Sequence, residues 1–467
     1  MQTKGLKIKV LQGGIYLALR QLFSVALSLI SVLVIARILG PEQYGVVAIA
    51  SGIFYFLFWV SGLGLAVYLI RQPELPEDGA EQILAFYNTV GLAFYGLLWF
   101  ATPIFGWWTG HEEISQVLRF LIPALWLGAI SNVSIGMLER ELRFAEVGLI
   151  ETLAQMANYL LAVPLVLMGW GYWGPIAGLV VQFFILTVLA QHYYPIRWRW
   201  HWHWQFLKPA LRYGLAYSGA DWILSLKALT VPLFVSRLLG VEAAGITSIA
   251  LRLVDQLAIL RLVVRRLSIS ALAKLVDNPS STRSAISQGM PYQVLLIGPI
   301  CAAFSCLATW IIPLMFGKAW IPSAQIFPFI ALAAIIGTIF DLHASALSAA
   351  GHNRQVAQFN AFYIGSLWLA ALLFLPILKL WGYGFAELLT IPSYLLMDRA
   401  LAKLCGAPNY WNSVWLIVAT APALLFGPWV SPVIGISILL ISYGLLFLLN
   451  ANVRSVPLEL YAVWRSR

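Results

Sequence analysis

Long runs of apolar residues, separated by short polar stretches, recur along the whole chain. About 20 consecutive apolar residues are enough for an α-helix to cross the hydrocarbon core of a bilayer. By this criterion the sequence predicts fourteen membrane-spanning helices, which cover residues 11–36, 44–70, 83–108, 117–138, 147–168, 174–194, 211–235, 244–264, 290–315, 324–349, 357–378, 383–402, 411–429 and 432–450. The expected fold class is therefore an all-α polytopic membrane protein. The longest stretches outside the runs, 71–82, 195–210 and 265–289, leave no room for a soluble catalytic domain.

A nine-residue motif occurs twice, at an offset of 200 residues, and each copy lies between two apolar runs. Both copies read Arg-x-Leu-Gly-x-Glu-x-x-Gly, with the shared charged and glycine positions at Arg37, Gly40, Glu42 and Gly45, and again at Arg237, Gly240, Glu242 and Gly245. Such a pattern predicts a tight turn between two helices. The arginine suits a helix C-terminus, the first glycine supplies a positive φ, and the glutamate suits the next helix N-terminus. We expect a structural role for the motif.

The repeated motif predicts that one half-molecule is written twice. The first and second predicted helices match the seventh and eighth, so the repeat unit has six helices, and both halves enter the membrane from the same face. Two such bundles are expected to be related by a pseudo-twofold axis along the membrane normal, as in some transporters. The predicted domains are an N-terminal lobe at 1–195, an interfacial linker at 196–210, a C-terminal lobe at 211–403, and two extra helices with a tail at 404–467.

Charge and composition fit a chain that faces lipid. Of the 467 residues, 61% are hydrophobic and 10% are charged, whereas soluble domains carry about 25% charged residues. With the N-terminus in the cytoplasm, 20 of the 29 lysines and arginines fall inside, five outside and four within spans. This bias predicts that both termini are cytoplasmic. The net charge of +10 therefore reflects topology, and nucleic acid is not an expected partner. Three cysteines without metal-ligand spacing predict neither a disulfide framework nor a metal site, and no cofactor is expected.

Several features together resemble a known family. They are the lysine-rich start, the motif at 37–45, the segment Met137-Leu-Glu-Arg-Glu-Leu-Arg-Phe144, and two six-helix halves followed by two extra helices. This combination resembles the polysaccharide transporter (Wzx-type) branch of the multidrug/oligosaccharidyl-lipid/polysaccharide exporter superfamily.

The resemblance implies a multi-pass flippase of the bacterial inner membrane that is not an enzyme. It would move undecaprenyl-pyrophosphate-linked oligosaccharide units to the periplasmic leaflet by alternating access, for lipopolysaccharide or exopolysaccharide assembly. Membrane lipids and a polysaccharide polymerase machinery are the implied partners. A multidrug or cation antiporter of the same superfamily is the alternative. The sequence contains no catalytic constellation that would favour a membrane enzyme.

Four basic residues lie within predicted spans and are the candidates for substrate contact in a cationic cavity: Arg20, Lys227, Arg252 and Arg261. A charge at the bilayer centre costs roughly 2.5–3.5 kcal/mol on insertion scales, so each needs a reason. Arginine offers bidentate, charge-assisted hydrogen bonds to a pyrophosphate. The resembling family implies a head-group clamp of arginines on helices 1 and 8, the places of Arg20 and Arg252. Alternatively, Asp255 neutralises Arg252 from one turn away on the same helix.

Coupling to an ion gradient would need a titratable acid within a cavity. The candidates are Asp221, Asp255, Asp341 and Glu387. Each could instead be a hydrogen-bond partner in helix packing, as could His343.

The linker at 197–204 alternates basic residues with tryptophans. An extended strand would place the arginines and histidines on one side and four tryptophans on the other. Tryptophan prefers the headgroup level and cations suit anionic lipid, so the strip is predicted to lie on the cytoplasmic interface. A metal site at His201 and His203, or a gate for lipid-linked substrate, are the alternatives.

Overall fold

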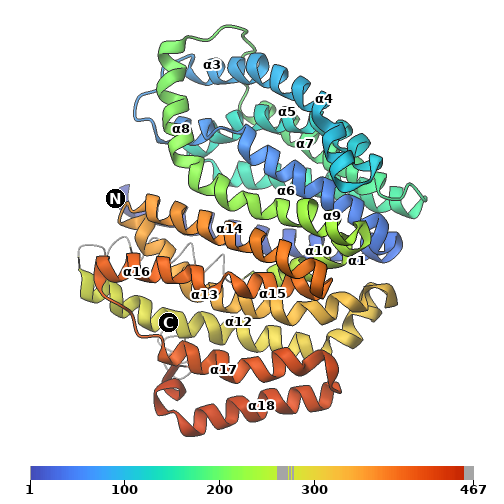
Figure 1. Ribbon diagram of the computed structural model, residues 1–467. Coiled ribbons are helices and arrows are strands. Elements are labelled where there is room, and N and C mark those ends of the chain that lie inside the picture. Colours follow the sequence, from blue (N-terminus) through green and yellow to red (C-terminus); the bar gives the residue numbers. More distant parts are fainter. Residues whose placement is uncertain (1, 260–271, 273–274, 276–277, 457–467) are drawn as a thin grey trace. The chain divides into compact units, whose positions relative to one another are not determined.

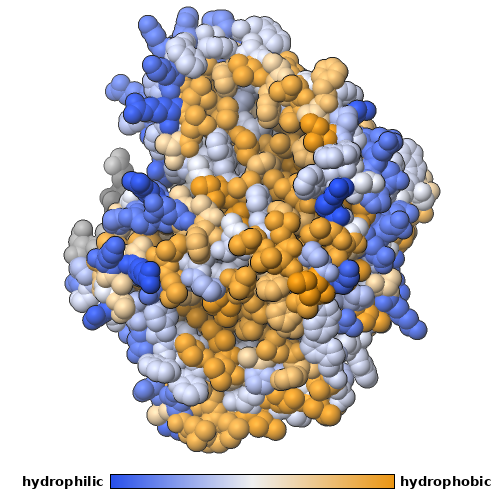
Figure 2. Space-filling model, viewed as in Figure 1, coloured by the Kyte–Doolittle hydropathy of each residue, from blue (hydrophilic) through white to orange (hydrophobic). Residues whose placement is uncertain are grey.

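The computed structural model describes residues 2–259, 272, 275 and 278–456, and for 2–26 and 220–221 it describes the backbone alone. In this part of the chain every regular element is a helix (Figure 1). The predicted all-α fold class is confirmed. Large apolar side chains lie on the surface (Figure 2), and among them Phe100 is 81% exposed and Leu448 79% exposed. Such a surface is suited to acyl chains and not to water, as expected of a multi-pass membrane protein.

The chain forms two compact units, Met1–Gly245 and Ile246–Arg467. The elements of the first unit are α1 (Gln2–Ser61), α2 (Leu65–Arg71), α3 (Gly79–Phe86), η1 (Tyr87–Gly91), α4 (Leu92–Thr109), α5 (Glu112–Arg140), α6 (Phe144–Leu167), α7 (Trp173–Tyr193), α8 (Trp204–Ser225), η2 (Leu226–Leu229), η3 (Val231–Val235), α9 (Ser236–Leu239) and the start of α10 (Val241–Leu257). Within this unit α5, α6 and α7 pack on one another, and α8 packs on α2.

The second unit continues α10 and then runs through α12 (Pro279–Met315), η4 (Lys318–Trp320), α13 (Ile321–Ala349), α14 (Asn353–Leu378), α15 (Trp381–Leu389), η5 (Ile391–Ser393), α16 (Tyr394–Cys405), α17 (Trp411–Phe426), η6 (Gly427–Trp429) and α18 (Pro432–Leu449). The helix α12 packs on α13 and α17, and α14 packs on α15. The predicted lobes are defined by the sequence repeat, whereas the two units are defined by packing. The predicted lobe boundaries therefore stay a prediction.

Eleven helices of the described chain are long and apolar enough to cross a membrane. The sequence predicts fourteen, and three features account for the difference. The first two predicted spans run together in α1, the eighth extends into residues outside the description, and the twelfth is divided by η5. The number fourteen stays a prediction.

The two copies of the repeated motif have the same backbone conformation. Gly40 has φ 68° and ψ 176°, and Gly240 has φ 91° and ψ 174°. A side chain is disfavoured at such positive φ values, so both glycines are required to end one helix and redirect the chain into the next. The charged residues of the motif at Arg37, Glu42 and Glu242 are exposed.

Candidate functional site

The predicted cationic clamp is described only in part. The helix α1 carries Arg20, whose side chain is outside the described residues, as is the whole of Arg261. Lys227 is half-buried in the first unit and Arg252 is half-buried on α10 in the second. Both make interactions with their surroundings. Whether these residues form one cavity stays a prediction.

Lys227 lies where a membrane helix loses its regular geometry. The helix α8 ends at Ser225, a 3₁₀ turn covers Leu226–Leu229, and a π-helical turn covers Val231–Val235. Pro232 contributes to the break because it has no backbone N–H to donate. Turns of these two kinds within a helix often mark functional sites. The proline is a visible bend signal in the sequence, but the change from 3₁₀ to π geometry is not.

The broken helix is held by side-chain hydrogen bonds to its backbone carbonyls. The indole Nε1 of Trp108, on α4, donates to the carbonyl of Leu233 at 2.9 Å. The Ser236 hydroxyl donates to the Pro232 carbonyl. These bonds satisfy acceptors of the irregular turn, which would be costly to leave unpaired in an apolar environment.

The second half of α1 packs directly against the broken helix. A Cβ atom at Gly52 would lie 2.9 Å from the Ala228 carbonyl oxygen and 3.0 Å from Pro232 Cγ, so only glycine fits there. Seven residues further along α1, the Trp59 carbonyl accepts a 3.1 Å hydrogen bond from Trp222 Nε1. The segment that carries Lys227 is therefore pressed onto α1 without an intervening side chain.

Two further pairs of glycines, at other positions along these helices, allow equally close backbone contacts. Near the start of α2, a Cβ at Gly64 would lie 2.5 Å from the Gly214 carbonyl oxygen of α8, and a Cβ at Gly214 would lie 2.2 Å from the Leu63 carbonyl oxygen. In the repeated motif, a Cβ at Gly45 would lie 2.0 Å from the Val241 carbonyl oxygen, and one at Gly245 would lie 2.1 Å from that of Pro41. We call the contacts of Gly45, Gly52, Gly64, Gly214 and Gly245 the glycine seam.

The two motif copies contact each other through equivalent residues in both directions. The last glycine of each copy meets the residue that follows the first glycine of the other copy, which is Val241 in one case and Pro41 in the other. This close backbone contact explains why both copies have the final glycine. The sequence pattern alone assigned that glycine to a turn. The signal was present as the repeated Gly45 and Gly245, but the contact joins segments 200 residues apart.

The arginine of the second motif copy takes part in packing. Arg237 is exposed, its guanidinium carbon lies 5.7 Å from the Trp108 ring centroid, and its Nη1 donates to the Trp108 carbonyl at 3.1 Å. A cation over an indole face contributes about 0.5–1 kcal/mol at an exposed site. These contacts are consistent with the structural role predicted for the motif.

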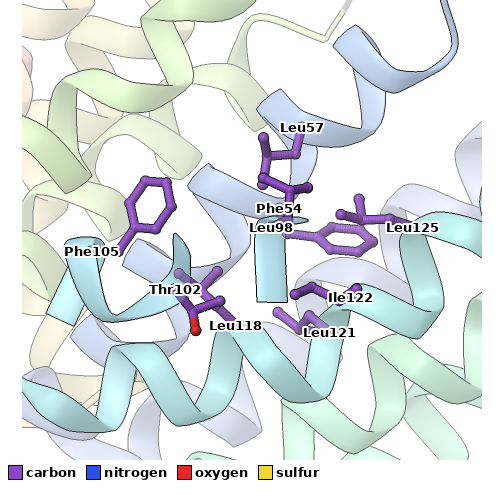
Figure 3. A pocket seen from close by; sticks show the side chains of 9 residues that line it. All are labelled: Phe54, Leu57, Leu98, Thr102, Phe105, Leu118, Leu121, Ile122 and Leu125. Carbon is purple, nitrogen blue, oxygen red and sulfur yellow. The ribbon is translucent and has the colours of Figure 1, made fainter. Parts of the chain in front are cut away.

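An apolar pocket lies between α1, α4 and α5 (Figure 3). Its volume of about 10 Å³ is at the lower limit for one water molecule. The one polar side chain that lines it, Thr102, already donates to the Trp99 carbonyl and accepts from Arg119 Nε, both at 2.9 Å. This pocket is too small and too apolar to shelter a pyrophosphate.

The four predicted ion-coupling acids have different surroundings. Asp221 has no described side chain, Asp255 is exposed on α10, and Asp341 is half-buried on α13. Glu387, on α15, is only 2% exposed. Its carboxylate accepts hydrogen bonds from the hydroxyls of Tyr363 at 2.9 Å and Tyr383 at 3.2 Å. Hydrogen-bonded packing thus accounts for its burial, and a role in ion coupling stays a prediction.

His343 is fully buried on α13 and belongs to a chain of polar groups. Its Nε2 lies 2.7 Å from the Tyr410 hydroxyl, which donates to Asp398 at 2.5 Å. Burial and the hydrogen bond to Asp398 raise the pKa of the Tyr410 phenol above its usual range. Tyr410 therefore keeps its proton and ties the loop before α17 to α13 and α16. His343 could be identified from the sequence as a candidate packing partner, but Tyr410 and Asp398 could not, because neither is local to it in the chain.

The tryptophan linker has no regular secondary structure, and two of its side chains contact α3 and η1. Trp202 Nε1 donates to the Thr89 hydroxyl at 3.0 Å, and Arg199 Nε lies 2.8 Å from Glu81. Trp198 and Trp200 are 50% and 62% exposed. The linker is thus anchored at Arg199 and Trp202 and exposes the indoles of Trp198 and Trp200. Its placement at the cytoplasmic interface stays a prediction.

Comparison with solved structures identifies the class of fold. The chain resembles lipid II flippase MurJ in an inward closed conformation, with a TM-score of 0.70, 15% identity, and coverage of 92% of this chain and 97% of that one. It also resembles a multidrug resistance MATE family transporter of the MOP superfamily in an inward-facing conformation, with a TM-score of 0.65, 14% identity, and coverage of 84% and 98%. The fold is therefore that of MurJ and the MATE transporters.

The sequence itself assigns the family. The profile described as polysaccharide biosynthesis protein matches residues 34–325, which is more than half of the chain. The chain belongs to this family, and the resemblance inferred from its motifs is confirmed.

Two curated relatives are similar over large parts of the chain. The succinoglycan biosynthesis transport protein ExoT of Rhizobium meliloti (strain 1021) is 24% identical over 301 residues, which is 63% of this chain and 60% of ExoT. The lipopolysaccharide biosynthesis protein WzxC of Escherichia coli (strain K12) is 21% identical over 432 residues, 88% of this chain and 85% of WzxC. The match thus spans less than two thirds of ExoT but most of WzxC.

Proposed function

We propose that this protein is a flippase that moves undecaprenyl-pyrophosphate-linked oligosaccharide units across the bacterial inner membrane for the assembly of a surface polysaccharide. The observation that carries the proposal is the combination of family and fold. The chain belongs to the polysaccharide biosynthesis protein family, and its fold is similar to that of a lipid II flippase. The names of ExoT and WzxC refer to polysaccharide transport or biosynthesis.

In this proposal Arg20 and Arg252 hold the pyrophosphate while it is out of water, and Lys227 assists them. A diphosphate loses its hydration in the membrane, and arginine replaces that hydration with bidentate hydrogen bonds. Arg261 is a further cation of the same cavity. Both termini are cytoplasmic, and the substrate enters from that side.

Alternating access in this proposal uses the broken helix at 226–235. A helix interrupted by 3₁₀ and π turns can bend at the break without losing a long run of backbone hydrogen bonds. The two lobes are related by pseudo-twofold symmetry and rock about the cation-lined cavity. The polysaccharide polymerase machinery would take up the translocated unit.

A multidrug or cation antiporter is the second candidate, favoured by the likeness to a MATE transporter and by the buried carboxylate of Glu387. The two candidates differ in what a cell loses when the protein is removed. An antiporter mutant becomes sensitive to a toxic cation or drug, whereas a flippase mutant accumulates a lipid-linked glycan.

Deletion of the gene, followed by extraction of the lipids, tests the proposal. We expect a lipid-linked oligosaccharide to accumulate and surface polysaccharide to disappear. The unchanged gene, when reintroduced, should reverse both effects. Arg20→Ala and Arg252→Ala should insert in the membrane but fail to restore export. Arg354→Ala, which changes an exposed arginine in the first turn of α14, is the matched control. Normal surface polysaccharide in cells that carry both clamp changes would refute the clamp.

A further inference from the structure

A polar cavity of about 250 Å³ lies in the second unit, well away from the residues of the proposed clamp in sequence. One wall is a face of α12, formed by Ser284, Ser287, Gln288 and Tyr292. These residues follow the i, i+3, i+4 spacing that brings side chains to one side of a helix. This volume is far above the roughly 10–15 Å³ that one water molecule requires, so the cavity can admit a small organic ligand.

The opposite walls come from two distant segments. Asn409 lies just before α17 and Asn412 in its first turn, and Ser455 lies in the helical residues 451–456 that follow α18. The three walls thus bring amide and hydroxyl groups of α12 together with those of segments more than 100 residues further along the chain. Lysine, arginine, aspartate and glutamate are absent from the nine lining residues. A neutral ligand with many hydroxyls is therefore favoured over an anion.

The cavity wall is fixed before any ligand binds. The Asn409 backbone N–H donates to the Ser287 hydroxyl at 3.0 Å, which joins the loop to α12. The neighbouring Tyr410 is held by its hydrogen bonds to His343 and Asp398. Asn412, in the first turn of α17, is half-buried. Polar groups held in place in this way lose little freedom on binding.

The helix α12 is long enough to extend beyond the hydrocarbon core of a bilayer. Its 37 residues extend about 55 Å at about 1.5 Å per residue, whereas the hydrocarbon core is about 30 Å thick. With the predicted span at 290–315, Ser284, Ser287 and Gln288 precede the core and Tyr292 lies at its edge. The charge distribution predicts that this end is cytoplasmic, where a lipid-linked glycan would be presented before transport.

We propose that this cavity binds a neutral sugar ring, and that it docks the glycan of the lipid-linked substrate on the cytoplasmic side before the pyrophosphate enters the transport path. Amides and hydroxyls recognise sugar hydroxyls by paired hydrogen bonds, and the Tyr292 ring offers an apolar face to a sugar. Only the identity of the lipid-linked ligand rests on the proposed function. Sugar binding itself is measured without transport, so the two can fail separately.

Hydrogen–deuterium exchange on the full-length protein in phosphatidylcholine nanodiscs tests this proposal. The probes are the methyl glycosides of glucose, galactose and N-acetylglucosamine in solution, and glucosyl-diacylglycerol added to the nanodisc. Glycerol 1-phosphate is the anionic comparison. We expect at least one sugar probe to slow exchange in peptides that cover 279–292 and 406–412. Protection by the lipid alone identifies a membrane-bound source, and protection by a free glycoside identifies the sugar as sufficient.

Two serines on α12 provide a matched pair of variants. Ser284→Ala changes the cavity wall, whereas Ser280→Ala changes an exposed serine one turn earlier that bonds to Asn278. We expect Ser284→Ala and Asn412→Ala each to weaken sugar binding by roughly tenfold, which is about 1.4 kcal/mol, and Ser280→Ala to leave it unchanged.

Three results would overturn the assignment. The first is the absence of protection by every sugar probe at its solubility limit. The second is protection by glycerol 1-phosphate and not by the sugars. The third is sugar protection that survives both cavity variants.

Discussion

The substitution Gly45→Ala tests the closest contact of the glycine seam. The added Cβ would lie 2.0 Å from the Val241 carbonyl oxygen, and real Cβ contacts are not shorter than 3.0 Å. The obstacle is a backbone atom that cannot rotate away, so the two segments must separate by about 1 Å. Overpacking of this kind costs roughly 1–3 kcal/mol.

The same substitution also carries a local gain. Alanine is up to about 1 kcal/mol more favourable than glycine inside a helix. Since the neighbour is rigid, we take the upper half of the overpacking range and expect a net loss of about 1–2 kcal/mol. For a unit of this size, about 2–4 °C is lost per kcal/mol, so the unfolding temperature in detergent should fall by roughly 2–8 °C.

Gly96→Ala is the matched control. It lies within α4 and a Cβ there meets nothing within 4 Å, so only the local gain remains and the unfolding temperature should stay or rise. The double variant Gly45→Ala with Gly245→Ala should lose less than the sum of the single losses, because one separation relieves both contacts. If Gly45→Ala behaves like Gly96→Ala, or if the two losses add fully, the described seam is wrong.

Three further predictions concern buried polar contacts, each measured as the thermal unfolding temperature in detergent. Glu387→Ala leaves two buried tyrosine hydroxyls without their acceptor and should destabilise the protein by about 1–3 kcal/mol. Glu387→Gln keeps an acceptor and should lose less stability. Equal losses of stability in the two variants would contradict this prediction. Trp202→Phe removes the bond to Thr89 and should destabilise by about 0.5–1.5 kcal/mol, and Trp200→Phe, at a 62% exposed position, should have no effect. Tyr410→Phe strands the buried His343 nitrogen and should destabilise by about 1–3 kcal/mol; a variant as stable as the parent would show that this network does not hold the loop.

Features that depend on neighbouring residues in the chain could be predicted from the sequence. The apolar runs predicted the helical fold, because each span must satisfy its own backbone hydrogen bonds in lipid. The positive φ of Gly40 and Gly240 followed from the motif, since a helix end of this kind requires glycine.

Features that depend on contacts between distant segments could not be predicted. The final motif glycines were visible, but their contact with the backbone at Val241 and Pro41 joins the two copies through space. For Glu387, the partner Tyr383 lies one turn away on the same helix and could have been found, whereas Tyr363 lies on α14. The polar cavity needs three segments, and only the α12 stripe is periodic.

The predicted clamp illustrates the same limit. Sequence identifies Arg20 and Arg252 as charges within apolar runs, but the side chain of Arg20 is outside the described residues and the two arginines belong to different units. Their joint action therefore depends on a functional measurement.

Reconstitution is the most direct test of the central claim that this protein carries a lipid-linked glycan across the membrane. The purified protein would be placed in liposomes with an undecaprenyl-pyrophosphate-linked oligosaccharide, and a glycosidase added outside would report the glycan that reaches the outer leaflet. We predict that the parent protein exposes glycan beyond the fraction that starts outside, and that the Arg20→Ala, Arg252→Ala double variant does not. Equal exposure in protein-free liposomes and in those with the parent protein would contradict the account.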